Sequence, residues 1–192
     1  AARIADAKAD LVVAYWHTSH GNQLLAGMAG MDHFYGDRGW YTLNGVGGLR
    51  LIAQGPDVGA FDSSSVANSA ALFQEDVRDY LADHADTNVV MASWCGQVGY
   101  PTTTVAGIES YLARMTELES EYPGVAFVYM TGHADGGGLE GQVHRYDRII
   151  RDYCEENGKW LFYFADSEGY DPDGISYIGR HPDDACRYYF NL

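Results

Sequence analysis

The chain contains four continuous apolar runs that predict buried β-strands. They are Leu11 to Trp16, Asn88 to Trp94, Val125 to Met130 and Trp160 to Ala165. Strands that are apolar throughout, rather than on alternate residues, are typical of a sheet covered on both faces. A shorter apolar piece, Leu49 to Ala53, predicts one further strand within a Gly-rich stretch from Asp32 to Ser65.

Segments with apolar residues three and four positions apart separate these runs and predict helices. The expected helices are Ile4 to Ala9, Asn22 to Met31, Ser65 or Asn68 to His84, Thr103 to Glu121, and Gln142 to Asn157. Strands that alternate with helices in this way indicate an α/β fold. We therefore expect a mainly parallel, five-stranded sheet with helices on both of its faces.

Length and charge narrow the possible functions. The 192 residues suit a single domain over the whole chain, 1–192. The formal net charge of −15 repels phosphate backbones and anionic bilayers, so we expect neither a nucleic acid nor a membrane as a partner. No apolar run approaches the roughly 18 residues of a membrane helix. We expect a secreted protein, extracellular or periplasmic, from which a signal peptide has been removed.

The first apolar run stops at a cluster of chemically competent side chains: His17, Thr18, Ser19 and His20. In a parallel sheet this position lies at the carboxyl edge, where ligands and catalytic groups collect. Ser19 is therefore the first candidate nucleophile. The alternative is that Thr18 or Ser19 caps the helix that begins near Asn22. Capping explains one hydroxyl group but not the two histidines beside it.

Four longer motifs give the chain a resemblance to a known family. The segments HTSHGNQLLAGM, NVVMASWCGQVG, YPGVAFVYMTGH and FADSEGYDPDG resemble the SGNH (GDSL-like) hydrolases, and more narrowly a group of secreted bacterial SGNH-type domains of poorly defined activity. The resemblance covers about Ile4 to Cys186 and implies a flavodoxin-like three-layer α/β/α sandwich. It also implies a serine esterase for a small or carbohydrate-linked ester that requires no cofactor.

The resemblance assigns roles to individual residues. Ser19 matches the block I nucleophile, and its backbone N–H would serve the oxyanion hole. Gln97, at the end of the Trp94–Gln97 segment that replaces the family's Gly-x-Asn-Asp, would donate its amide to the oxyanion. The block II glycine falls in the Gly-rich stretch, where Gly59 and Gly48 are the candidates. We expect His20, Trp94 and Gly59 to contact the substrate.

The family's block V motif, Asp-x-x-His, is absent, because no Asp in the chain has a His three residues later. A serine hydroxyl is a poor nucleophile without a base that accepts its proton. We therefore predict that His133, at the end of the VAFVYM strand, is the general base, and that Asp166 or Asp173 orients it. The alternative is that His133 fixes a Gly-rich loop through hydrogen bonds.

The same histidines allow a second hypothesis, a transition-metal site. His17, His20 and His133 could ligate copper or zinc through neutral imidazoles at one edge of the sheet. The turn from Asp171 to Gly174 also hints at calcium. It lacks a full loop of regularly spaced oxygen ligands, however, so an ordinary turn is the stronger interpretation.

A third hypothesis is a glycan-binding module without catalysis. Trp40, Tyr41, Phe61 and Tyr100 fall in loops near the predicted edge, where aromatic rings can stack on sugars. A hydrolase fold can lack activity because the fold does not settle the function.

The three cysteines leave two questions open. Cys95 follows a buried strand and is a minor candidate for the nucleophile. Cys154 and Cys186 lie in polar C-terminal sequence and could form a disulfide that holds the tail.

Overall fold

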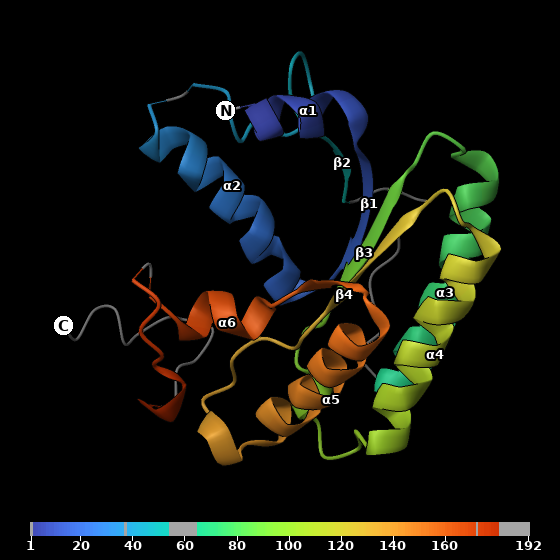
Figure 1. Cartoon of the computed structure of the whole chain (residues 1–192), viewed down its shortest axis with the longest axis vertical. Coiled ribbons are helices and arrows are strands. Elements are labelled where there is room, and N and C mark those ends of the chain that lie inside the picture. Colours follow the sequence, from blue (N-terminus) through green and yellow to red (C-terminus); the bar gives the residue numbers. More distant parts are fainter. Residues whose placement is uncertain (1, 37, 54–64, 172, 181–192) are drawn as a thin grey trace.

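The computed structural model describes residues 2–36, 38–53, 65–171 and 173–180. Five parallel strands form one sheet in the order β2-β1-β3-β4-β5 (Figure 1). The strands are β1 (Val12–His17), β2 (Arg50–Ile52), β3 (Val89–Ser93), β4 (Ala126–Met130) and β5 (Trp160–Phe162). This order is that of flavodoxin-like folds, so the predicted parallel sheet is confirmed.

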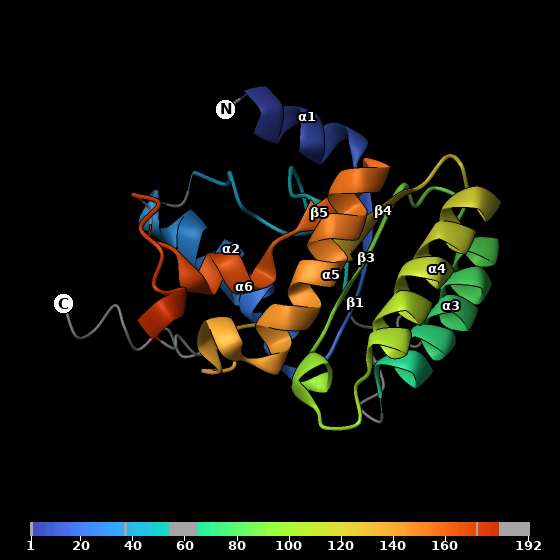
Figure 2. The same ribbon diagram turned by 60° about the horizontal axis from the view of Figure 1, so that its bottom comes forward.

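Helices cover both faces of the sheet, as Figure 2 shows. The larger core cluster joins one face to α3 (Val66–Asp83), α4 (Val105–Glu121) and α5 (Gln142–Asn157). The smaller core cluster joins the other face to α2 (Asn22–Phe34) and α6 (Phe164–Gly169). A further helix, α1 (Ala2–Asp10), precedes β1. In the described part of the chain, no helix combines the length and the apolar character that a membrane span needs.

Strand β1 contributes side chains to both core clusters because successive side chains point to alternate faces of the sheet. Ala14 and Trp16 enter the larger cluster, whereas Val13 and Tyr15 enter the smaller one. All six residues of β1 are buried, which explains why the sequence is apolar throughout and not on alternate positions.

Helix α2 is attached much less firmly than the helices on the other face. None of its residues is buried, and Leu24 and Leu25 pack only half-buried against the smaller core cluster. Helix α3 by contrast buries eight residues, among them Phe73 and Val77. The layer that carries α2 is therefore the weaker of the two.

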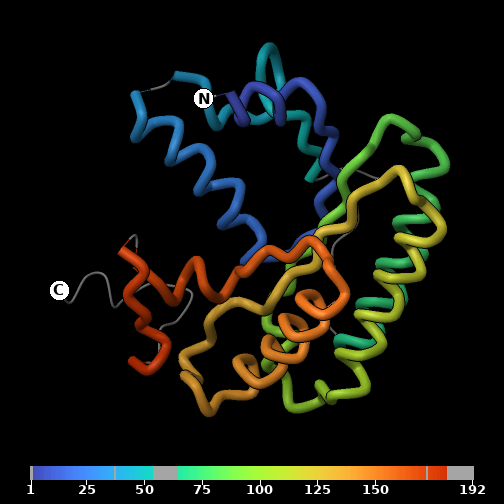
Figure 3. The backbone as a smooth tube through the Cα atoms, viewed as in Figure 1, coloured from blue at the N-terminus to red at the C-terminus, as the bar shows by residue number. Residues whose placement is uncertain are grey.

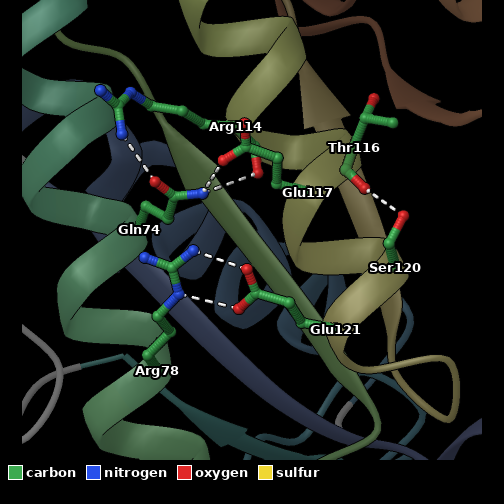
Figure 4. A network of polar contacts seen from close by, with 7 residues as sticks. All are labelled: Gln74, Arg78, Arg114, Thr116, Glu117, Ser120 and Glu121. Carbon is green, nitrogen blue, oxygen red and sulfur yellow. Dashed lines mark hydrogen bonds and ion pairs between the residues drawn. The ribbon is translucent and has the colours of Figure 1, made fainter.

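A polar network joins α3 to α4 (Figure 4). Arg78 donates to both carboxylate oxygens of Glu121, at 2.8 and 2.6 Å. Gln74 donates to Glu117 at 2.7 Å and accepts from Arg114 at 2.6 Å. Exposed ion pairs of this kind contribute about 0–1 kcal/mol each, so the apolar inner faces supply most of the attachment.

Local sequence signals set most helix boundaries correctly. Ser65 caps α3 by accepting from the Asn68 N–H at 3.2 Å, and Thr104 caps α4 by accepting from the Gly107 N–H at 3.1 Å. The strand predicted to reach Ala165 is wrong at its end. It stops at Phe162, and α6, which the sequence did not predict, begins at Phe164.

Cys154 is a free thiol and is only 2% exposed. It packs in the larger core cluster with Tyr146 and Ile150, which precede it on the inner face of α5. Helical spacing thus places Cys154 in the core, and not in the polar surroundings from which the open question of a Cys154–Cys186 disulfide arose. Cys186 itself lies outside the described residues.

Candidate active site

The carboxyl ends of β1, β3 and β4 bring separate polar segments to one edge of the sheet. These three strands are neighbours, and His17 at the end of β1 is in register with Ser93 at the end of β3. Figure 3 shows the chain leaving the three strands on the same side, into α2, into the loop before α4 and into the loop before α5. Ser19 and His20, Cys95, and His133 all lie just beyond these ends.

Three of these side chains contact one another. The rings of His20 and His133 stack with their centroids 3.9 Å apart and their planes 15° from parallel. His20 Nδ1 also lies 3.2 Å from the sulfur of Cys95. An imidazole at this distance from a thiol can take its proton. The predicted meeting of β1 and β4 histidines at one edge is thus what the structure shows.

His133 is held in a defined tautomer. Its Nδ1 lies 2.9 Å from the carbonyl oxygen of Ala134, and because a carbonyl only accepts, Nδ1 donates. In the neutral ring Nε2 is then the basic nitrogen, as a general base requires. His133 lines a hollow of about 160 Å³ together with Cys95, Val98 and Tyr100. The side chain therefore both fixes its loop and faces a space for a ligand.

Ser19 has a strained backbone and an exposed side chain. Its φ of 41° lies in the left-handed region, which only one other described residue besides glycine, Asn44, adopts. The Ser19 carbonyl accepts from the Asn22 N–H, whereas the caps of the turn at Ser19–Gly21 and of α2 use no side-chain hydrogen bond. The capping alternative is therefore wrong. Strain of this kind is typical of functional positions.

Gln97 and Trp94 are not placed as expected. Gln97 is fully buried, and its side-chain oxygen accepts from the Cys95 N–H at 2.7 Å, so it shapes the loop after β3 and does not reach the hollow. Trp94 is 1% exposed and packs edge-to-face on Tyr111, with ring centroids 4.9 Å apart. Trp94 is therefore a core residue and not a substrate contact.

The predicted carboxylates lie away from His133. Asp166 accepts from Arg151 at 2.5 Å, and Asp173 lies in an exposed turn. Neither has a hydrogen bond to a histidine in the described structure. The prediction that one of them orients His133 is not met, because Asp166 pairs across α5 and α6 instead.

Two carboxyl groups that the sequence reasoning missed lie beside His133. Glu168 accepts from the Ala134 N–H at 2.6 Å, and Asp147 accepts from the Gly132 N–H at 2.7 Å. Burial raises the pKa of Asp147 to about 8. Asp147 could have been found, since it is an acidic residue four positions after Val143 on the inner face of α5. Glu168 offered no such signal without α6.

The alternative metal site is not formed. In the described ranges no group of three or more His, Cys, Asp or Glu side chains is arranged to hold a metal ion. His17 is directed with Tyr15 to the smaller core cluster, with ring centroids 4.7 Å apart, and burial lowers its pKa. The Asp171 carboxylate accepts from the Asp173 and Ile175 N–H groups, as in an ordinary turn.

The aromatic loop residues divide between two edges of the sheet. Tyr100 lines the hollow. Trp40 and Tyr41 follow α2, which runs back from the carboxyl edge toward α1 (Figure 1). Lys8 of α1 donates to the carbonyls of Gly39 and Gly47, which holds this loop near the amino end of β1. The expectation that Trp40 and Tyr41 lie at the catalytic edge is therefore wrong.

The two glycine candidates for the oxyanion hole have different outcomes. Gly48 lies two residues before β2 begins, which places it at the amino edge of a parallel sheet, away from Ser19. It is therefore not a donor at the site. Gly59 lies outside the described residues, as does Phe61.

Comparison with known proteins adds a likeness of fold. No protein-family model and no curated protein sequence matches the chain. Among solved structures, a candidate acylhydrolase from Bacteroides fragilis is similar, with a TM-score of 0.50 and 10% sequence identity. The likeness covers 98% of this chain and 90% of that one. The chain therefore shares the three-layer architecture of that protein over nearly its whole length.

Proposed function

We propose that this protein is an SGNH-type hydrolase that cleaves a small or carbohydrate-linked carboxylic ester at the carboxyl edge of β1, β3 and β4. The observation that carries the proposal is the stacked pair of His20 and His133, with the strained, exposed Ser19 directly before His20 in the chain. The fold likeness to a candidate acylhydrolase supports it. A hollow lined by His133 offers space for part of the substrate.

In this proposal Ser19 is the nucleophile and His133 the base. The Ser19 oxygen attacks the ester carbonyl carbon while His133 Nε2 takes the hydroxyl proton. The proton then passes to the alcohol oxygen as the C–O bond breaks, which leaves an acyl group on Ser19. Water attacks that group, His133 takes the water proton, and the carboxylic acid leaves as Ser19 regains its proton. His20 supports the ring of His133 by stacking.

The direct test is hydrolysis of p-nitrophenyl acetate and of an acetylated sugar by the wild-type protein and by Ser19→Ala. We expect kcat to fall by at least about 100-fold, because removing the nucleophile leaves only binding and oxyanion contacts. Ser120→Ala is the matched control, since Ser120 is exposed on α4 and bonds only within that helix. Equal turnover by Ser19→Ala would remove Ser19 from the mechanism.

The contact between Cys95 and His20 supports a second candidate, in which the Cys95 thiol is the nucleophile of the same acyl transfer. The sulfur lies 3.2 Å from His20 Nδ1 and on the wall of the hollow that His133 lines. Cys95→Ala distinguishes the two candidates. If Cys95→Ala loses turnover and Ser19→Ala keeps it, the thiol is the nucleophile. If neither loses turnover, ester hydrolysis at this edge is refuted.

A further inference from the structure

Two buried carboxyl groups hold the backbone on either side of His133. The Gly132 N–H donates to Asp147 Oδ1 at 2.7 Å, and the Ala134 N–H donates to Glu168 Oε2 at 2.6 Å. Asp147 belongs to α5 and Glu168 to α6, so the two contacts approach the loop from different helices. We call this arrangement the carboxyl clamp.

The carboxyl clamp carries a free-energy penalty, because both of its carboxyl groups are removed from water. Asp147 is 1% exposed and Glu168 is 4% exposed. Burial of a carboxyl group is unfavourable unless its hydrogen bonds compensate for lost hydration, and an apolar side chain of similar size would avoid the penalty. Two such groups converge here on backbone amides only two residues apart, those of Gly132 and Ala134. The loop they hold carries the only imidazole that both lines the hollow and stacks on His20 within the described residues.

The helices that carry the clamp are also joined to each other. Arg151, one turn after Asp147 on α5, donates to Asp166 at 2.5 Å, and Asp166 precedes Glu168 by two residues on α6. This ion pair sets the position of α6 against α5. The loop after β4, α5 and α6 therefore form one connected unit around His133.

We propose that Asp147 and Glu168 are positioning residues for the imidazole of His133. They fix the backbone at residues 132 and 134, and the bond from His133 Nδ1 to the Ala134 carbonyl then fixes the ring. The clamp would do here what the Asp of an Asp-x-x-His motif does elsewhere, but through the main chain. This inference rests on the proposed function of His133, whereas the hydrogen bonds can be tested without it.

The experiment compares Asp147→Ala and Glu168→Ala with Asp147→Asn and Glu168→Gln. The alanine variants remove the acceptor, and the amide variants keep an acceptor oxygen of the same shape. We expect Asp147→Ala to accelerate amide hydrogen exchange at Gly132, and Glu168→Ala at Ala134, each by at least about 10-fold. We expect kcat to fall by about 10- to 100-fold with KM nearly unchanged, because a small misplacement of the base slows proton transfer. The amide variants should recover most of kcat.

Three outcomes overturn the proposal: unchanged exchange at both amides in the alanine variants, a loss that appears in KM and not in kcat, or amide variants as slow as the alanine variants. If the wild-type protein hydrolyses no ester, the proposed function fails, but the exchange rates at Gly132 and Ala134 still show whether the carboxyl clamp holds the loop. If an alanine variant does not fold, an NMR titration of the wild-type protein tests the contact between Asp147 and Gly132. The amide proton resonance of Gly132 must move as Asp147 titrates, and a resonance that stays fixed refutes the contact.

Discussion

His20 and His133 come from the ends of different strands, β1 and β4, and their rings nevertheless stack at 3.9 Å. Each ring is also held by a partner of its own: His20 Nδ1 lies 3.2 Å from the Cys95 sulfur, and His133 Nδ1 lies 2.9 Å from the Ala134 carbonyl oxygen. The stack therefore joins the loops after β1, β3 and β4.

The first prediction separates the roles of these two rings. His133→Phe removes the proposed base and should lower kcat/KM for ester hydrolysis by about 10²- to 10⁴-fold. His20→Phe keeps an aromatic ring against His133 and should cost less than about 10-fold, since stacking of aromatic pairs contributes about 0.5–1.5 kcal/mol. Steady-state kinetics on p-nitrophenyl acetate measures both. A larger loss in His20→Phe would make His20 the base.

The second prediction concerns Asp147 and pH. Its usual pKa is near 4, and burial raises it to about 8 in the folded protein, with Arg151 opposing and Asp166 and Asp135 reinforcing the shift. Between these values the folded state binds the extra proton, so stability falls as pH rises from about 4 to 8, by at most about 1.4 kcal/mol per pH unit.

In the Asp147→Asn variant, residue 147 cannot ionise. The variant should therefore not show the loss of stability that ionisation of Asp147 causes as the pH rises. Thermal unfolding midpoints measured from pH 4 to 10 should show the wild-type protein declining relative to Asp147→Asn up to about pH 8, and the two curves running parallel above it. Curves that are parallel throughout would mean that Asp147 ionises normally in the folded state.

The third prediction uses the thiols. Cys95 is half-buried, lines the hollow and contacts His20, whereas Cys154 lies in the core, where burial raises its pKa to about 12. Because the thiolate is the reactive form, iodoacetamide should modify Cys95 in the native protein and leave Cys154 unmodified. Peptide mass spectrometry identifies the site. In guanidinium chloride both should react, and modification of Cys154 in the native protein would contradict its burial.

The fourth prediction tests the packing at the start of α2. A Cβ on Gly21 would lie 2.3 Å from the Cβ of His17 and 2.9 Å from the hydroxyl of Tyr15. Gly21→Ala should therefore destabilise the protein by about 1–3 kcal/mol. Gly27→Ala lies within α2 and has no atom within 4 Å of the added carbon, so it should instead stabilise the protein by up to about 1 kcal/mol. Urea unfolding of both variants gives the comparison.

The sheet could be predicted from the sequence because buried parallel strands leave a continuous apolar run, as at β3 and β4. Helix α6 could not, because Phe162 and Phe164 continue the apolar pattern of β5 across the change from strand to helix. Without α6, the two carboxylates of that segment could not be told apart. The sequence therefore favours Asp166, which pairs with Arg151, over Glu168, which accepts from the Ala134 N–H.

The site itself was only partly predictable. Residues directly after the strands, Ser19, His20 and His133, could be placed at one edge because a parallel sheet aligns its carboxyl ends. Trp40 and Tyr41 could not, because their position depends on the direction in which α2 leaves the edge. Trp94 could not be placed correctly either, because the buried part of this segment extends one residue beyond β3. Cys95, and not Trp94, is therefore the first residue that lines the hollow.

The weak attachment of α2 gives the two sides of the site different mechanical properties. His133 is held by α5 and α6 through buried hydrogen bonds, while Ser19 leads into a helix that buries no residue. Segments with few buried contacts open at a lower free energy than the protein as a whole. The helix that follows Ser19 should therefore detach at a lower free energy than the segments that hold His133.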